Sequence, residues 1–134
     1  FNEIKKYDII IIDSPCSAIG TIRKNPEIFF KKDDPNLTEL ICLQEKMLEK
    51  ASRLVSKDGY IVYMTCSFLK IETIDQIHKF LKKHSNFILY NFKLKRNNIK
   101  YSKLIKNNFM ITLPDNVFNN QIDGFFASFL KRIK

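Results

Sequence analysis

Hydrophobic positions along the chain follow two different periods, and the alternation between them predicts the order of the elements. One continuous apolar run covers Tyr7–Ile12 and another covers Tyr60–Thr65. Short β-branched runs of this kind are typical of strands that are buried on both faces of a parallel sheet. Two further apolar segments, Phe87–Leu94 and Gly124–Leu130, are also predicted to be strands.

Between the first three of these strands, apolar residues occur at the spacing of an α-helix. Apolar residues recur every three or four positions from Asn36 to Ser56, and Lys57–Gly59 supplies a stop signal. A second amphipathic helix is predicted over Ile71–Lys83, whereas the polar segment Asn97–Asn108 is predicted to be a loop.

The order strand–helix–strand–helix–strand predicts an α/β fold with a largely parallel sheet and right-handed crossovers. In such sheets the ligand site lies at the carboxyl ends of the strands. The loop Asp13–Gly20 follows the first strand, and Cys66–Ser67 follows the second. We therefore expect a carboxylate and two thiols, those of Asp13, Cys16 and Cys66, at one edge of the sheet.

Composition narrows the class of protein. With 134 residues, 45% hydrophobic and 28% charged, the chain has the balance of one globular domain or part of one. No apolar run approaches the ~20 residues of a membrane span, and no signal peptide is evident, so a cytoplasmic protein without a membrane partner is expected. Three cysteines without Cys-x-x-Cys spacing predict reduced thiols and no metal.

The charge balance gives a weaker indication. Lysine and arginine total 23 against 14 acidic residues, for a net charge of +9. A basic surface favours a polyanionic partner, because binding to phosphates releases counterions. However, 19 lysines, 19 isoleucines and 12 asparagines are also the profile of an AT-rich genome. Charge alone therefore favours a nucleic-acid partner only slightly.

Glycine is scarce, and that bears on cofactor binding. The only glycines are Gly20, Gly59 and Gly124, and no Gly-x-Gly-x-x-Gly or phosphate loop occurs. A doubly wound enzyme normally binds its cofactor on a glycine-rich first turn. The pattern is typical of the back half of such a domain.

The three cysteines have different surroundings in the sequence. Cys42 lies among helical core positions and is expected to be a small core residue. Cys16 and Cys66 each follow a strand, in loops rather than among apolar positions. A helix is predicted closely after Cys66, and amides at its N-terminus can stabilise a thiolate there.

The sequence around these two loop thiols resembles the cysteine motifs of RNA 5-methylcytosine methyltransferases of the Sun/Nop group. The matching segments are DSPCSAIGTIRKNPE at Asp13–Glu27 and VYMTCS at Val62–Ser67. The closing Asp123–Ala127 is similar to the last strand of that family. Lys70–Thr73 departs from the usual Pro-Glu-Glu-Asn, where Glu72 matches the pattern and the asparagine is missing.

The resemblance covers nearly the whole chain and carries expectations about fold and partners. It implies that residues 1–134 are the C-terminal catalytic half of a Rossmann-like S-adenosylmethionine-dependent methyltransferase domain, with a mostly parallel sheet and an antiparallel last strand. The glycine-rich cofactor-binding half and the N-terminal RNA-binding region of that family are expected to be absent, so the chain alone is expected to be inactive. RNA, in particular small-subunit ribosomal RNA, is the implied partner, and a monomer is expected.

The family resemblance also assigns the two thiols. It implies that Cys66 adds to carbon 6 of cytosine as the nucleophile and that Cys16 assists product release. Chemistry alone leaves this order open, because DNA 5-methylcytosine enzymes use a Pro-Cys thiol like Pro15–Cys16 as the nucleophile.

Four further residues have expected roles around the base. Asp13 can hold the ring-nitrogen edge of cytosine, and the family places it beside the cofactor. The backbone carbonyl of Pro15 can accept from the exocyclic amine of the base. Arg23 and Lys24 are candidate phosphate contacts, although a solvated basic loop explains them equally well.

Three other functions compete with this interpretation. An amino-methyltransferase would carry Asn/Asp-Pro-Pro-aromatic at the first strand end, where Ser14 and Cys16 stand instead. A DNA cytosine-5 methyltransferase would not need the second thiol at Cys66. A non-catalytic basic RNA-binding fragment is the alternative from a different class.

Overall fold

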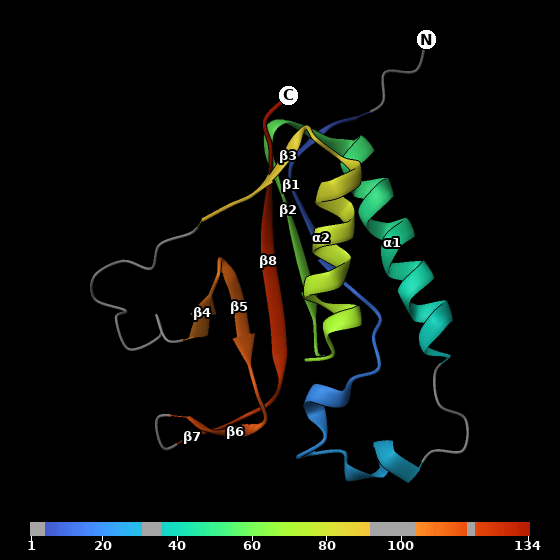
Figure 1. The fold of residues 1–134 in the computed structure, drawn as a ribbon, viewed down its shortest axis with the longest axis vertical. Coiled ribbons are helices and arrows are strands. Elements are labelled where there is room, and N and C mark those ends of the chain that lie inside the picture. Colours follow the sequence, from blue (N-terminus) through green and yellow to red (C-terminus); the bar gives the residue numbers. More distant parts are fainter. Residues whose placement is uncertain (1–4, 31–35, 92–103, 118–119) are drawn as a thin grey trace.

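The computed structural model describes residues 5–30, 36–91, 104–117 and 120–134. The strands are β1 (Tyr7–Asp13), β2 (Val55–Thr65), β3 (Phe87–Leu89), β4 (Ile105–Lys106), β5 (Phe109–Thr112), β6 (Asp115–Val117), β7 (Asn120–Ile122) and β8 (Phe125–Arg132). The helices are α1 (Leu37–Leu54) and α2 (Ile74–Lys83), with short 3-10 turns η1 (Ile19–Thr21), η2 (Pro26–Phe30) and η3 (Lys70–Glu72). Figure 1 shows their arrangement.

The main sheet has the order β1-β2-β8-β5-β4, and β3 also pairs with β8. β1 and β2 are parallel, whereas β8 is antiparallel to β2, β3 and β5. β8 is thus the predicted antiparallel last strand, and β1, β2 and β3 run in one direction. Among the described residues only the β1–β2 pairing is itself parallel, because β8 lies between β2 and β3.

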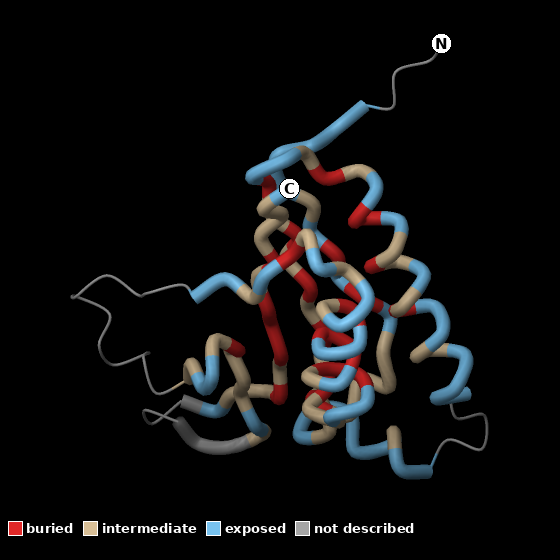
Figure 2. Tube along the Cα trace, turned by 45° about the horizontal axis from the view of Figure 1, so that its top comes forward, coloured by how far each residue is buried: buried red, intermediate tan, exposed pale blue. Residues whose placement is uncertain are grey.

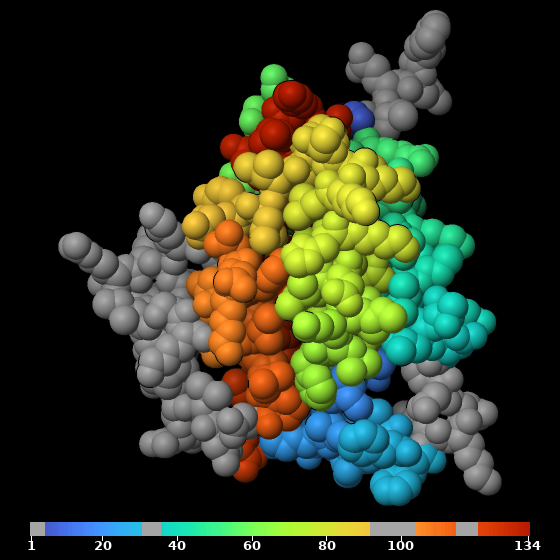
Figure 3. All heavy atoms as spheres, in the orientation of Figure 1, coloured from blue at the N-terminus to red at the C-terminus, as the bar shows by residue number. Residues whose placement is uncertain are grey.

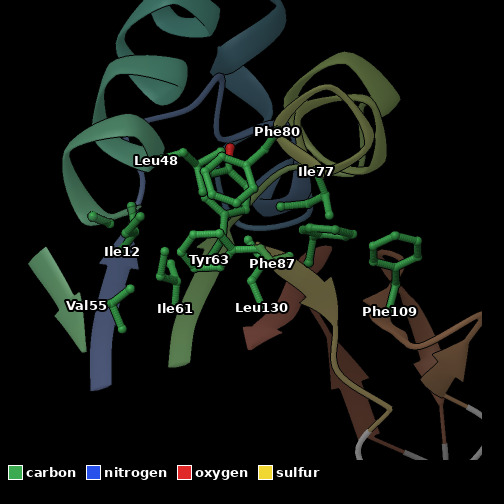
Figure 4. Packing of buried hydrophobic residues seen from close by; sticks show 12 residues of the cluster. Ile12, Leu48, Val55, Ile61, Tyr63, Ile77, Phe80, Phe87, Phe109 and Leu130 are labelled. Carbon is green, nitrogen blue, oxygen red and sulfur yellow. The ribbon is translucent and has the colours of Figure 1, made fainter. Parts of the chain in front are cut away.

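Both helices lie on one face of this sheet (Figure 1). Alternate residues of β2, among them Ile61 and Tyr63, are fully buried beneath them, and Leu48 and Phe80 pack down from α1 and α2. Figure 4 shows these side chains pointing between the strands and the helices, and in Figure 2 the buried positions concentrate along the central strands. No helix in the described part of the chain is long and apolar enough to cross a membrane.

The opposite face of β1 is open, so the prediction that Tyr7–Ile12 is buried on both faces is wrong for this chain. Ile12 is buried beneath the helices, but Ile9 and Ile11 are 61% and 64% exposed. β1 is an edge strand of the sheet, and no element of the described ranges covers that face. The sequence pattern indicated the strand correctly but not the number of layers around it.

Two predicted boundaries shift around β2. The first helix ends at Leu54 rather than Ser56, and β2 starts at once at Val55. The expected stop signal lies inside the strand, where Asp58 takes a positive φ of 63°. At this point the pairing with β1 skips residues, from Tyr7 opposite Val55 to Ile9 opposite Tyr60. The stop residues therefore form a bulge rather than a loop.

The C-terminal third contains a hairpin where a loop was predicted. β4 and β5 pair across a turn at Asn107 and Asn108, whose φ angles of 51° and 67° are those of a tight hairpin turn. Residues 97–103 of the predicted loop lie outside the described residues. So do residues 92–94 of the predicted strand Phe87–Leu94, of which β3 covers the first three positions.

Candidate functional site

The carboxyl ends of β1 and β2 lie side by side and direct the two cysteine loops to one edge of the sheet. Asp13 pairs in register with Met64, and the amide of Ser14 extends the ladder by donating to the Met64 carbonyl at 2.9 Å. In Figures 1 and 3 the segment after β1, coloured blue, closes the lower end of the molecule below α2. The predicted convergence of the two loops is confirmed.

The two loop thiols are in direct contact. The Sγ atoms of Cys16 and Cys66 lie 3.2 Å apart, and both residues are half-buried. Burial, together with the hydrogen bond to Cys66 and its charge, raises the pKa of Cys16 to about 12. Cys16 therefore stays protonated at neutral pH and can donate to Cys66. Cys42, by contrast, is exposed on α1, so its predicted core position is wrong.

The raised pKa predicts slow alkylation of Cys16. A pKa of about 12 instead of the ordinary 9.0 leaves roughly 10³-fold less thiolate at pH 8. With iodoacetamide, followed by peptide mass spectrometry, we expect the Cys16 rate to rise about tenfold per pH unit from pH 8 to 10.5. A rate that levels off near pH 9 would contradict this.

The raised pKa of Cys16 also predicts how stability depends on pH. Because the folded protein keeps this proton up to a higher pH than the unfolded chain, its free energy of unfolding should fall as pH rises from about 9 to 12.

A glycine joins the two loops to the start of β8. The Gly20 amide donates to the Cys66 carbonyl at 3.0 Å, and the Gly20 carbonyl accepts from the Gly124 amide at 2.7 Å. A Cβ at Gly20 would lie 2.1 Å from the Gly124 oxygen, so only glycine fits this crossing of three segments. Close by, Ala18 adopts a left-handed φ of 57°, which is unfavourable for a residue with a side chain.

A fully buried carboxylate, that of Glu72, binds the serine that follows each of the two cysteines. Glu72 accepts from the Ser17 amide at 2.8 Å, from the hydroxyls of Ser17 and Ser67 at 2.6 Å each, and from Gln44 Nε2 at 3.2 Å. Sequence reasoning did not place Gln44 in the site, although it is a polar residue at helical spacing between the apolar Leu40 and Leu48. That interruption of an apolar stripe was the available signal.

Asp13 and Pro15 are exposed where β1 ends and the first cysteine loop begins. Asp13 is exposed at the end of β1, on the rim of a groove of about 460 Å³ formed by β1 and α1. The Pro15 carbonyl already accepts from Gln44 Nε2 at 3.0 Å, which leaves its second lone pair for another donor. No group of three His, Cys, Asp or Glu side chains suited to hold a metal ion occurs in the described ranges.

The predicted phosphate contacts are paired with an acidic residue. Arg23 and Lys24 both form ion pairs with Asp123, at 3.2 and 2.7 Å, and Arg23 also donates to Gln121 at 2.6 Å. The Lys24 ammonium lowers the pKa of Asp123 below its ordinary value, and Arg23 adds to the effect. The basic loop is therefore tied to the segment before β8 rather than being freely solvated.

Comparison with curated proteins finds bacterial relatives. Ribosomal RNA small subunit methyltransferase B of Photorhabdus laumondii is 39% identical over 84 residues, which are 63% of this chain and 20% of that protein. The enzyme of the same name from Yersinia enterocolitica is 41% identical over 81 residues, or 60% of this chain and 19% of that protein. The chain spans about a fifth of the length of these relatives.

Comparison with solved structures identifies proteins that share the fold of this chain. The crystal structure of PH0851 superimposes with a TM-score of 0.76 and 31% identity, over 93% of this chain and 26% of that one. NSun6 from Pyrococcus horikoshii with SFG gives a TM-score of 0.72 at 19% identity, over 97% of this chain and 31% of that one. The predicted Rossmann-like fold is confirmed. The family model described as 16S rRNA methyltransferase RsmB/F matches residues 2–131, and the chain belongs to this family.

Proposed function

We propose that this chain is the C-terminal catalytic part of an S-adenosylmethionine-dependent enzyme that methylates carbon 5 of cytosine in small-subunit ribosomal RNA. The observation that carries the proposal is the 3.2 Å contact between the Cys16 and Cys66 sulfurs at the ends of two parallel strands. Cytosine-5 chemistry has a use for two thiols, one to attack the ring and one to help release it. Membership of the family supports a ribosomal RNA substrate.

Cys66 is the nucleophile in this mechanism. Carbon 5 of cytosine is a poor nucleophile, but addition of a thiolate at carbon 6 creates an enamine that places electron density on carbon 5. Carbon 5 then takes the methyl group, which S-adenosylmethionine supplies when bound. The raised pKa of Cys16 supports this order, because it disfavours the thiolate there and leaves attack to Cys66.

Cys16 acts after methyl transfer. The carbon-5 proton must leave so that the electrons of the C–H bond can expel Cys66 from carbon 6 and restore the ring. Once the Cys66 sulfur is a neutral thioether, it no longer adds its charge to the causes that raise the pKa of Cys16, whereas burial, the largest cause, remains. Cys16 then gives its own proton to solvent and, as a strongly basic thiolate, takes the proton from carbon 5, so attack and proton removal belong to different thiols.

The remaining site residues hold the base and the cofactor. The free lone pair of the Pro15 carbonyl accepts from the exocyclic amine of cytosine, and Asp13 faces the ring-nitrogen edge. Asp13 also borders the groove beside β1, which fits a cofactor held between this chain and a preceding half of the domain. The structural relative solved with SFG, an analogue of S-adenosylmethionine, is consistent with this donor.

Methyl transfer by the full-length protein tests the proposal. Incubation with unmodified small-subunit ribosomal RNA and labelled S-adenosylmethionine should place the label in 5-methylcytidine, detected by nucleoside mass spectrometry. Label in another nucleoside would contradict the assignment to carbon 5 of cytosine. RNA binding without any transfer would favour the non-catalytic alternative.

Phosphate binding by Arg23 and Lys24 predicts a change in salt dependence. On single-stranded RNA, each alanine substitution should make the slope of log affinity against log salt less steep by about 0.7, because one counterion-releasing contact is lost. Titration of labelled RNA between low and moderate salt measures the slope. Lys57→Ala, at an exposed position near the other end of β2, is the matched control and should leave the slope unchanged. Unchanged slopes for both site variants would contradict phosphate binding and leave these side chains with their contacts to Asp123 and Gln121 alone.

A further inference from the structure

The two Cys-Ser dipeptides of the site share a single acceptor. Ser17 and Ser67 each follow a cysteine directly, and both hydroxyls donate to the same Glu72 oxygen at 2.6 Å. The Ser17 amide donates to the other Glu72 oxygen at 2.8 Å. Loops that are 50 residues apart in sequence are thus bonded to one side chain, at the position next to each thiol.

Glu72 is itself firmly held. It is fully buried in η3, between the second cysteine loop and α2. Gln44 donates to its carboxylate at 3.2 Å, and the Tyr63 hydroxyl donates to its backbone carbonyl at 2.8 Å. Gln76 donates in turn to the Gln44 side-chain oxygen at 3.0 Å. A buried carboxylate that loses its donors is costly, so Glu72 cannot shift without breaking several bonds at once.

We propose that Glu72 is a positioning residue that sets the spacing of the Cys16 and Cys66 sulfurs by holding the serine after each thiol. The consequence for catalysis rests on the proposed function, whereas the sulfur spacing is a property of the fold itself. Attack at carbon 6 and proton removal at carbon 5 occur on adjacent ring atoms. Both sulfurs must therefore reach one base, and small displacements reduce the rate steeply.

The effect of Glu72 on the spacing of the two sulfurs can be tested without any methyl transfer. Two protein thiols and one oxidised glutathione give one protein disulfide and two reduced glutathiones, so this equilibrium reports the effective concentration of one thiol near the other. The full-length protein is used with Cys42→Ser, which removes the exposed thiol on α1. The Cys16–Cys66 disulfide is quantified by mass spectrometry of the linked peptides.

Three variants separate positioning from general stability. Glu72→Ala should lower the effective concentration roughly tenfold or more, because both serines lose their shared acceptor. Glu72→Gln should stay within about threefold of the parent, since the amide oxygen can accept from the Ser17 amide while the amide nitrogen donates to both hydroxyls. Ser67→Ala should give an intermediate loss, and it decides the question if Glu72→Ala does not fold.

Leu48→Ala is the matched control, because Leu48 is buried in the core and its apolar side chain takes no part in the hydrogen bonds of this network. It should destabilise the fold and leave the effective concentration unchanged. Parent-like values in both Glu72→Ala and Ser67→Ala would overturn the inference, as would an equal loss in Leu48→Ala.

Methyl transfer measured on the same variants distinguishes this inference from the proposed function. In Glu72→Ala we expect a lower kcat with an unchanged KM for S-adenosylmethionine, and recovery of kcat in Glu72→Gln. Loss of effective concentration in a protein that transfers no methyl to cytosine would contradict the proposed function alone. Full methyl transfer by Glu72→Ala would contradict the positioning role alone.

Discussion

Cys66→Ala in the full-length protein is expected to reduce methyl transfer to cytosine by roughly 10³-fold or more. Without this sulfur no thiolate adds to carbon 6, and carbon 5 keeps its low reactivity toward a methyl donor. Incorporation of labelled methyl groups into RNA measures the loss. Cys42→Ser is the matched control, since Cys42 is exposed on α1 and should leave the rate within about twofold.

The same assay should give a different result for Cys16→Ala. In this variant the attack by Cys66 and the methyl transfer still proceed, but the base for the carbon-5 proton is missing. One methyl group per enzyme should therefore be transferred, without further turnover. Equal loss of the first turnover in both variants would contradict the division of labour between the two thiols.

Gly20→Ala is the second substitution with a large expected effect. The new Cβ would lie 2.1 Å from the Gly124 oxygen and 2.7 Å from the Cys66 oxygen, both of them backbone atoms that cannot swing aside. We expect the free energy of unfolding to fall by about 2 kcal/mol, measured by urea denaturation. Because the Cys66 backbone must shift, methyl transfer should fall further, by roughly 10²-fold.

Gly59→Ala separates these two effects. A Cβ at Gly59 would lie 2.7 Å from the Asp8 oxygen, so this variant should lose stability to a similar degree. Gly59 lies near the start of β2, whereas Cys66 follows its end, and the thiol pair should stay intact. Methyl transfer by the folded Gly59→Ala protein should therefore remain near the parent rate. An equal loss of activity in both glycine variants would show that the effect at Gly20 is one of stability alone.

The sequence predicted those parts of the fold that depend on local pattern. Apolar runs and helical spacing identified β1, β2, α1 and α2, and the rule for parallel strands correctly placed Cys16 and Cys66 at one edge. The exposure of Ile9 and Ile11 could not be predicted, because a pattern of apolar residues does not say what covers them. The β4–β5 hairpin was missed because the Asn107–Asn108 signal lies in a strongly polar segment.

The supporting contacts of the site were beyond sequence reasoning for a different reason. Glu72 was noted as part of a motif, but its bonds to Ser17 and Gln44 join three separate segments of the chain. Arg23 likewise finds its partner Asp123 one hundred residues further on. Such pairings follow from the tertiary fold, and no rule based on the spacing of residues along the chain predicts them.

The most direct test of two-thiol catalysis is denaturing electrophoresis of the Cys16→Ala protein after incubation with RNA and S-adenosylmethionine. The account predicts a protein–RNA band that survives denaturation, because the methylated base stays bound to Cys66 when the carbon-5 proton cannot leave. The band should vanish in the Cys16→Ala/Cys66→Ala double variant. A stable band from Cys66→Ala and none from Cys16→Ala would reverse the two roles, and full methylation without a band in either single variant would contradict thiol catalysis itself.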